Sequence, residues 1–338
     1  MNAAAKPYDG QNKYIRITDI DEVSSTYNNS SIVSPDGILS ENYVVNEGDI
    51  LLARTGASTG KSYLYRKSDG KLYYAGFLIR ANVAEHNPYF VFSQLHTHRY
   101  WRWVSIMSAR SGQPGINSLE YASFPIFTTT LKEENKISSL LSLIDKRIAT
   151  QNKIIEKLQS LIKGIAQNIV LRNKPNVRIS QCLECSSSTL QESDVWEYGA
   201  YPVYGANGVV GFLDNYNTSN EAIYIIKDGS GVGAVSYVAG KCSATGTLNI
   251  LQAKKGFSLR YLYYLLNIFN FEPYKTGMAI PHIYFKDYGK AQIFCPSYSE
   301  QLKYAKFLAT IDDKLLTEQN VLINLSLQKQ YLLRQMFI

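Results

Sequence analysis

The octapeptide TGASTGKS, residues Thr55 to Ser62, is the part of this chain that comes closest to a site for chemistry. A phosphate-binding loop needs two glycines separated by four residues, then Lys and Ser or Thr, with a helix N-terminus behind it. Here Gly56 and Gly60 are separated by only three residues, and the sequence from Ser62 to Arg66 alternates like a strand. A loop between two strands offers a phosphate no helix dipole. We therefore interpret the segment as a glycine-rich turn and not as a nucleotide site.

The other reactive residues form no catalytic or metal-binding pattern in the sequence. Cys182 and Cys185 make a CxxC pair, but zinc needs a second pair at ligand spacing, and the two remaining cysteines stand alone. His96 and His98 lie two residues apart, where side chains on a helix do not share a face. No nucleophile elbow, HExxH motif or nuclease-like set of acids with Lys is present. We expect buried thiols, no metal, no cofactor and no catalysis by this chain.

The composition indicates a folded protein with a weak preference for an anionic partner. The 338 residues carry a net charge of +7, although many soluble proteins are as basic. The chain has 26 Tyr, a side chain common at recognition surfaces because it contributes a ring and a hydroxyl at little entropic cost. The sequence shows neither the apolar core of a signal peptide nor an apolar run of membrane-spanning length. We expect two or more domains in a soluble, cytoplasmic protein.

The chain contains an internal repeat. A shift of 167 residues aligns residues 111–170 with residues 278–337 without a gap. So many matches at one offset are not expected by chance, and they indicate one architecture that is built twice. The aligned pairs include Pro114 and Pro281, Tyr121 and Tyr288, and Asp145 and Asp312.

The carboxy half of each copy has the pattern of a long coiled-coil helix. Apolar residues recur at alternating steps of four and three, which is the spacing of the positions that face a partner helix. Both seams turn polar at the same place, Gln151 and Glu318, and a polar seam position tends to fix the register. We expect the two helices to pair through Ile137, Leu141, Ile144, Ile148, Gln151, Ile155, Leu158, Ile162, Leu308, Ile311, Leu315, Glu318, Leu322, Leu325 and Leu332.

The amino half of each copy predicts a mixed α+β domain. In the first copy we place strands near 14–18, 49–53, 62–66 and 72–80, and a helix over 88–104 that Asn87 caps. In the second copy we place strands near 201–204, 209–213, 222–227, 234–238 and 248–251, and a helix from Ser258 to Phe269 with Ser258 as its N-cap. The predicted order is a domain in 1–131, a helix in 132–173, a domain in 174–295 and a helix in 296–338.

Glycine-rich polar loops follow equivalent strands of the two copies. TGASTGK after Arg54 corresponds to DGSGVG after Lys227. Glycines let a backbone approach a surface closely, and cationic and polar side chains hold phosphates and bind base edges. One frame with two sets of loop residues would recognise two different short DNA sequences. We predict DNA contacts from Arg54, Thr55, Ser58, Lys61, Arg110, Gln113, Lys227, Asp228, Ser230, Lys241, Lys275 and His282.

The order of these motifs resembles the specificity subunits of type I restriction-modification systems. The matching phrases are GDILLARTG at 48–56, GMAIPHI at 277–283 and IFCP at 293–296, and the resemblance covers essentially the whole chain. It implies an α+β fold of two target-recognition domains separated by two long helices in an antiparallel coiled coil, with an internal pseudo-twofold repeat. It also implies that each domain binds one part of a split, asymmetric site in double-stranded DNA.

The resemblance further implies partner subunits and one departure from the family. Two modification subunits would dock on the chain, carry S-adenosylmethionine and methylate adenine, and restriction subunits would add cleavage driven by ATP with Mg²⁺. This chain would select the DNA and catalyse nothing. The departure concerns the first domain, which begins almost at its first predicted strand, near Tyr14. It is short of an opening segment like the one from Pro175 to Tyr198 that precedes the first clear strand of the second domain.

Two other classes of function stay open at this point. The repeated domains could bind protein or carbohydrate as part of a coiled-coil scaffold, or the glycine-rich loop could serve a nucleotide-using enzyme. Sequence-dependent binding of duplex DNA together with an adenine methyltransferase would favour the specificity subunit over the scaffold. Tight ATP binding that is lost on Lys61→Ala would favour the enzyme.

Overall fold

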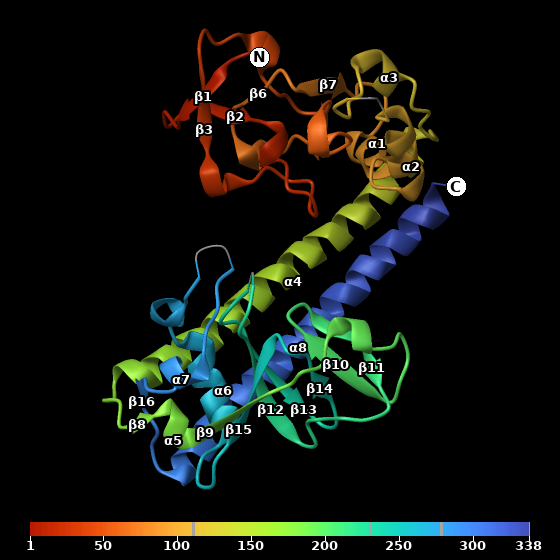
Figure 1. The fold of residues 1–338 in the computed structure, drawn as a ribbon. Coiled ribbons are helices and arrows are strands. Elements are labelled where there is room, and N and C mark those ends of the chain that lie inside the picture. Colours follow the sequence, from red (N-terminus) through yellow and green to blue (C-terminus); the bar gives the residue numbers. More distant parts are fainter. Residues whose placement is uncertain (110–111, 230, 278–279, 338) are drawn as a thin grey trace. The chain divides into compact units, whose positions relative to one another are not determined.

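A computed structural model gives the fold of the chain and describes residues 1–109, 112–229, 231–277 and 280–337. The chain divides into two compact units, one of residues 1–151 with 321–338 and the other of residues 152–320. Both divisions fall inside the two long helices, α4 (Leu131–Leu171) and α8 (Tyr298–Met336). Each unit therefore contains one α+β domain and a stretch of both helices (Figure 1).

The first domain is built on short strands around one buried strand, β4. The central sheet is antiparallel with the order β5-β4-β7, while β2 pairs with β6 in parallel and β1 pairs with β3. Both faces of β4 are covered, since Leu51 joins one apolar cluster and Ile50 joins another. The strands are β1 (Ala4–Pro7), β2 (Lys13–Ile15), β3 (Val33–Asp36), β4 (Asp49–Ala53), β5 (Ser62–Leu64), β6 (Leu72–Tyr74) and β7 (Leu78–Asn82).

Three short helices follow these strands: α1 (Pro88–Gln94), α2 (His98–Met107) and α3 (Ser118–Ala122). The predicted continuous helix over 88–104 is wrong, because the chain breaks at Leu95 and Thr97 caps α2 by accepting from Tyr100 N at 3.3 Å. The predicted cap at Asn87 is confirmed, since its side chain accepts from two backbone N–H groups of α1. The predicted strand over 72–80 is likewise divided, into β6 and β7.

The second domain has a larger sheet of the same kind. It is antiparallel with the order β13-β12-β15-β9, beside a smaller sheet of order β11-β10-β14 and the pair β16-β8. The five predicted strands are present as β10 (Tyr201–Gly205), β11 (Gly208–Leu213), β12 (Glu221–Ile226), β13 (Val235–Ala239) and β15 (Leu248–Ala253). The predicted helix is α6 (Leu259–Ile268), and its predicted cap is confirmed because Ser258 Oγ accepts from Tyr261 N.

Several short elements of the second domain were not expected from the sequence. They lie mostly before the first predicted strand and after α6, and they complete the edges of the sheets. They are β8 (Val177–Arg178), α5 (Ile179–Cys182), β9 (Leu183–Ser187), β14 (Ser243–Ala244), α7 (Phe285–Tyr288) and β16 (Gln292–Ile293).

The two long helices run antiparallel within the first unit. Leu141 of α4 shares an apolar cluster with Leu333 of α8. Four residues further along α4, Asp145 Oδ1 lies 2.6 Å from Lys329 Nζ, which is four residues earlier in α8. Residue numbers therefore rise along one helix as they fall along the other, as the predicted fold class requires.

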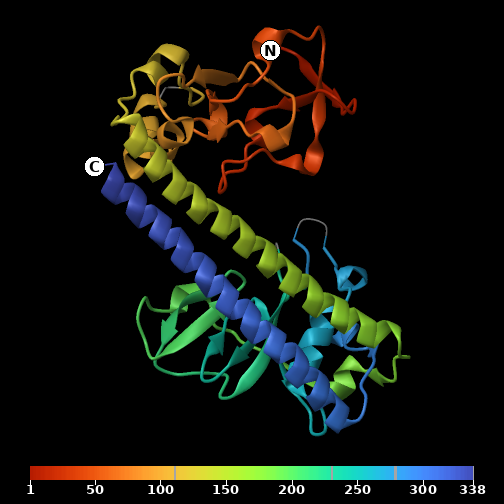
Figure 2. The same ribbon diagram turned by 180° about the vertical axis from the view of Figure 1, so that it is seen from behind.

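In the second unit the remaining stretches of the same helices share one core. Ile169 of α4 and Leu308 of α8 belong to the same apolar cluster, and within each unit the two helices lie side by side in both views (Figure 1, Figure 2). Every residue of the predicted seam is buried or half-buried. Leu143 and Leu161, which lie off the seam, are 58 % and 48 % exposed. The burial thus follows the spacing of four and three.

A buried polar side chain near the start of each long helix holds the adjacent domain. Glu134 Oε2 accepts a hydrogen bond from Asn87 N, which begins α1, at 2.8 Å. At the position 167 residues later, Gln301 Oε1 accepts from Ser258 N, which begins α6, at 2.9 Å. Both side chains are at most 2 % exposed. Each domain is therefore tied to its helix by the amide that starts one of its own helices.

Glu134→Ala should destabilise the protein by about 1–3 kcal/mol at neutral pH, because buried donors lose their acceptor. Burial opposes ionisation of this carboxyl, but hydrogen bonds from Asn87, His86 and Thr129 outweigh it and lower its pKa below the usual 4.5. The stabilisation is therefore present above that value and is lost as the pH falls through the lower pKa of the folded protein. Chemical denaturation of the full chain at neutral pH and at about pH 3 measures the loss of stability and its dependence on pH.

The exposed neighbour supplies the control for this experiment. Glu133→Ala removes a carboxylate that pairs with Lys136, at 3.4 Å on the helix surface, and should change the stability by less than about 0.5 kcal/mol. A loss in Glu134→Ala that is the same at both pH values would contradict the assigned role of the buried carboxylate.

Candidate nucleic-acid interface

In the first domain a cationic residue at the end of a buried strand is tied to two loops. Arg54 directly follows β4, and its backbone N–H donates to Phe77 O at 3.0 Å. Its carbonyl accepts from Ile116 N at 2.9 Å, and Gly56 N donates to Pro114 O at 2.9 Å. The glycine-rich loop and the loop before α3 therefore lie against one another, with the Arg54 side chain exposed between them.

The second domain repeats this backbone frame bond for bond. Lys227 follows β12, its N–H donates to Thr247 O at 3.0 Å, and its carbonyl accepts from Ile283 N at 3.0 Å. Gly229 N donates to Pro281 O at 3.1 Å. We call these two arrangements the paired-loop frames, made of residues 54–60 with 113–116 and of residues 227–229 and 231–233 with 280–283. They confirm the correspondence between the two glycine-rich loops.

The glycines of these loops are required by backbone conformation. Gly56 and Gly60 have φ values of 70° and 93°, and their counterparts Gly229 and Gly233 have values of 89° and 91°, a region that other residues rarely adopt. TGASTGKS thus forms a short turn between β4 and β5, and a strand follows it where a phosphate loop would have a helix. The structure agrees with the interpretation of this segment as a turn.

Two buried tyrosines hold the first loop from beneath. Tyr121 Oη donates to Ala53 O at 2.6 Å and accepts from Gly60 N at 3.1 Å, and Tyr100 Oη donates to Gly60 O at 2.8 Å. Burial raises the pKa of Tyr121 to about 12, so its hydroxyl stays protonated and able to donate at neutral pH. The loop backbone is thereby fixed from the core side, which leaves its outer side to contact a ligand.

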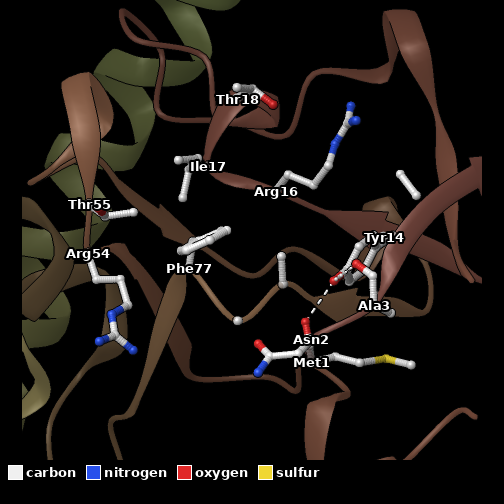
Figure 3. A pocket seen from close by; sticks show the side chains of 13 residues that line it. Met1, Asn2, Ala3, Tyr14, Arg16, Ile17, Thr18, Arg54, Thr55 and Phe77 are labelled. Atoms are coloured by element: carbon white, nitrogen blue, oxygen red, sulfur yellow. Dashed lines mark hydrogen bonds between the residues drawn. The ribbon is translucent and has the colours of Figure 1, made fainter. Parts of the chain in front are cut away.

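The first frame borders a cavity of about 770 Å³ in the first domain. Arg54 and Thr55 line it together with Arg16 and the ring of Phe77, which lies between the two arginines in the view of Figure 3. Phe77 is 62 % exposed, whereas Arg16 is held by Asp19 at 2.7 Å. This edge of the domain therefore combines an unpaired aromatic face with cations.

In the second frame the exposed groups are different. His282 Nδ1 lies 2.6 Å from Asp228 Oδ1, and the backbones of these two residues form a β-bridge. The ring of Tyr284 is nearly parallel to that of His282, with centroids 6.4 Å apart. Lys227 is half-buried at the base of the loop. The second frame thus offers an oriented imidazole and a carboxylate where the first offers Thr55 and a glycine.

The frames bring together only some of the predicted DNA-binding residues. Arg54, Thr55, Ser58 and Gln113 lie on the first frame, and Lys227, Asp228 and His282 lie on the second. The other three described cations have partners: Lys61 contacts Glu22 at 3.4 Å, Lys275 contacts Glu272 at 2.6 Å, and Lys241 lies over the rings of Tyr201 and Tyr216 beside the smaller sheet. Arg110 and Ser230 lie outside the described residues.

The structure supplies no metal-binding cluster among the described residues. Cys182, Cys242 and Cys295 are buried and Cys185 is half-buried, and none forms a disulfide. Within the same described part of the chain, no helix is long and apolar enough to cross a membrane.

Comparisons with known proteins show what this chain is similar to. Residues 176–325 match the family model of the type I restriction modification DNA specificity domain. The specificity subunit of the EcoprrI type I restriction enzyme from Escherichia coli is 25 % identical over 126 residues, which are 37 % of this chain and 30 % of that protein. A putative type I restriction enzyme specificity subunit of Haemophilus influenzae is 26 % identical over 113 residues, 32 % of this chain and 29 % of that protein.

The similarity of fold extends over the whole chain. The crystal structure of the type I restriction-modification system S subunit from M. genitalium covers 99 % of this chain and 90 % of its own, with a TM-score of 0.67 at 17 % identity. The chain is thus similar to type I specificity subunits, and its residues 176–325 match their DNA specificity domain. In sequence it matches about a third of the length of the curated specificity subunits, and the solved structure adds the shared fold.

Sequence reasoning missed Phe77, which lies beside the first frame. An exposed aromatic beside a cationic strand end is a candidate for contact with bases. The sequence Tyr74-Ala75-Gly76-Phe77-Leu78 gives no sign that Phe77 points outward, because apolar residues on both sides of it are buried. A signal in the sequence was Gly76, which corresponds to Gly246 of the second domain. The residues after these two glycines, Phe77 and Thr247, therefore take equivalent places beside the two frames.

Gly60→Ala should destabilise the first frame by roughly 1–3 kcal/mol, through a strained backbone and a new Cβ against α2. The Cβ would lie 2.7 Å from Val104 Cγ1, at a φ of 93°. Gly164→Ala is the matched control, since nothing lies within 4 Å of its Cβ position inside α4, and it should stabilise by about 0.5–1 kcal/mol. Chemical denaturation of the two variants should give shifts of opposite sign, and shifts of the same sign would contradict the geometry.

Proposed function

We propose that this chain selects a bipartite, asymmetric DNA site for a type I restriction-modification complex and takes no part in catalysis. The observation that supports this most is the pair of frames, which share their backbone bonds and differ in their side chains. Side chains at the end of a strand and in two adjoining loops can bind base edges and phosphates. Two frames with different donors and acceptors would recognise two different half-sites.

The first frame offers groups for phosphate and base contact. The exposed guanidinium of Arg54 can bind a phosphate or the O6 and N7 atoms of guanine with two donors. The side-chain amide of Gln113 can bind the N6 and N7 atoms of adenine in the same paired manner. Because Gly56 and Gly60 carry no side chains, the backbone between them can come close to the DNA.

The second frame offers a different set. Asp228 binds His282 at Nδ1, so the opposite ring nitrogen faces away from the carboxylate and would contact the DNA. Lys227 would hold a phosphate at the base of the frame. An imidazole and a carboxylate accept and donate differently from Arg54 and Gln113, so the second half-site would differ from the first.

The proposal includes modification subunits that bind S-adenosylmethionine and methylate adenine in cellular DNA, in the cytoplasm. The long helices present apolar side chains that lie off the seam, and an exposed apolar surface is typical of a protein interface. They include Leu143, Leu161, Phe307, Leu316, Ile323, Leu327 and Tyr331. Restriction subunits, where present, would supply cleavage driven by ATP with Mg²⁺.

Methylation mapping tests the proposed function directly. The chain is expressed with type I modification subunits from the same cells, and methylated adenines are sequenced with and without it. We expect one split motif that appears only in the presence of the chain. Duplex binding that does not depend on sequence, with no new methylated motif, would support the scaffold instead.

Variants of the first frame should separate phosphate contacts from base contacts. Arg54→Ala should weaken duplex binding of the complex roughly tenfold and lower the salt slope by about one, whereas Gln113→Ala should relax the motif in one half-site only. Lys67→Ala is the control, because Lys67 is an exposed cation that pairs with Glu47 away from the frame. It should leave the duplex affinity, the salt slope and the methylated motif unchanged. Binding titrations at several salt concentrations and methylation mapping measure these effects, and a change in both half-sites from Gln113→Ala would contradict the assignment.

A further inference from the structure

Ile280 occupies in the second frame the place that Gln113 has in the first. Each directly precedes a proline whose carbonyl accepts from the first glycine of the facing loop, Pro114 at 2.9 Å and Pro281 at 3.1 Å. The shift of 167 residues aligns the same two positions. The second frame therefore carries an apolar side chain at the place where the first frame carries an amide.

Backbone contacts hold the chain on both sides of Ile280. Thr276 and His282 exchange backbone hydrogen bonds of 2.9 and 2.7 Å, which close the loop that contains Ile280. Gly277 has a φ of 88°, and a Cβ at this residue would lie 2.4 Å from Ile280 O. Pro281 restricts the residue before it to extended conformations, and the branched Cβ of Ile280 restricts its χ1 angle. The isoleucine side chain thus has little freedom to lose on binding.

The side chain of Ile280 is open to a ligand. Ile280 is 58 % exposed. Among the described atoms outside the neighbouring residues, none lies within 4 Å of a Cβ built on Gly229, so Ile280 does not fold back over this glycine. In the first frame, by contrast, Gln113 Nε2 lies 3.0 Å from a Cβ built on Gly56. The second frame therefore presents methyl groups at its surface.

An apolar side chain at a position that faces DNA has one matching group on the base edges. In the major groove these edges carry hydrogen-bond donors and acceptors, and the C5 methyl group of thymine is the apolar exception. Contact between this methyl group and those of isoleucine removes apolar area from water and leaves no polar group without a partner. The nearby His282 ring, held by Asp228 at 2.6 Å, would bind an adjacent base pair or phosphate.

We propose that Ile280 recognises the C5 methyl group of a thymine in the half-site bound by the second domain, and is therefore a specificity-determining residue. This role rests on the proposed function and adds the chemical identity of one base pair to it. An exposed apolar residue can instead act as a wedge between base pairs. A wedge would bind independently of the thymine methyl group, so the two roles give different results in the experiment below.

Duplexes that contain deoxyuridine test the contact, because uracil differs from thymine only in lacking the C5 methyl group. The chain is assembled with its modification subunits, and binding is titrated with duplexes in which the thymines of the methylated motif are replaced one at a time. We expect one replacement, in one half-site, to weaken binding about three- to fivefold. If no replacement changes the affinity, the role of Ile280 is overturned, while sequence-dependent binding and the proposed function still stand.

Variants of the chain assign that thymine to Ile280. Ile280→Ala should weaken binding of the thymine duplex by a similar factor and abolish the difference between thymine and uracil at that one position. Ile280→Val keeps the branch at Cβ and should retain most of the difference. Ile38→Ala is the control, because it makes the same substitution outside both frames at a position that is 94 % exposed. It should change neither the affinity nor the preference for thymine.

Two further outcomes would count against the methyl contact. An Ile280→Ala protein that folds by circular dichroism and binds more weakly, yet still distinguishes thymine from uracil, would show that Ile280 acts as a wedge or as part of the loop structure. Binding of the wild-type complex that does not depend on sequence at all would overturn the methyl contact and the proposed function together.

Discussion

A single buried contact between a long helix and a backbone amide sets the position of each α+β domain on its helices. Leaving the amide of Asn87 or Ser258 without an acceptor would cost about 1–3 kcal/mol, so a rotation that breaks the bond to Glu134 or Gln301 is disfavoured. A second contact in each domain also holds that domain in place on the long helices. The hydroxyl of Tyr89 binds Asp145, and the hydroxyl of Tyr264 lies 3.2 Å from Asp312, which is the equivalent helix position.

From that anchor the position of the glycine-rich loops follows through packed elements. In the first domain α2 follows α1 after the break at Leu95, and it presses Val104 and Tyr100 against Gly60. The loop is therefore positioned by the core and by backbone bonds, and its outward side chains carry little of the structure. Different residues can therefore occupy equivalent places in the two domains without altering the frame around them. Examples are Thr55 and Asp228, and Phe77 and Thr247.

Periodicity and local chemistry were enough to predict much of this fold. The spacing of four and three located both long helices, and the 167-residue offset placed Asp145 over Asp312 before any contact was known. Short edge elements were not predictable in the same way, because β1 and β9 contain Lys, Pro, Cys or Ser and owe their conformation to a partner strand. The break at Leu95 was missed because Thr97 reads as a helix interior residue until its hydroxyl is seen to cap α2. Which residues beside the frames point outward was equally hidden, since exposed Phe77 and buried Tyr73 have similar sequence surroundings.

The apolar cluster of the first unit has a consequence for how the protein is made. Phe90 packs against Phe337, with ring centroids 5.2 Å apart, and Leu141 packs against Leu333. A ribosome that adds about 5–20 residues per second finishes the first α+β domain long before it reaches the second half of this cluster. During that interval of roughly ten to forty seconds the domain waits with an apolar face uncovered. The amino-terminal part of this protein is thus the first to emerge and the last to be completed, and it is the part in which a molecular chaperone would have most to protect.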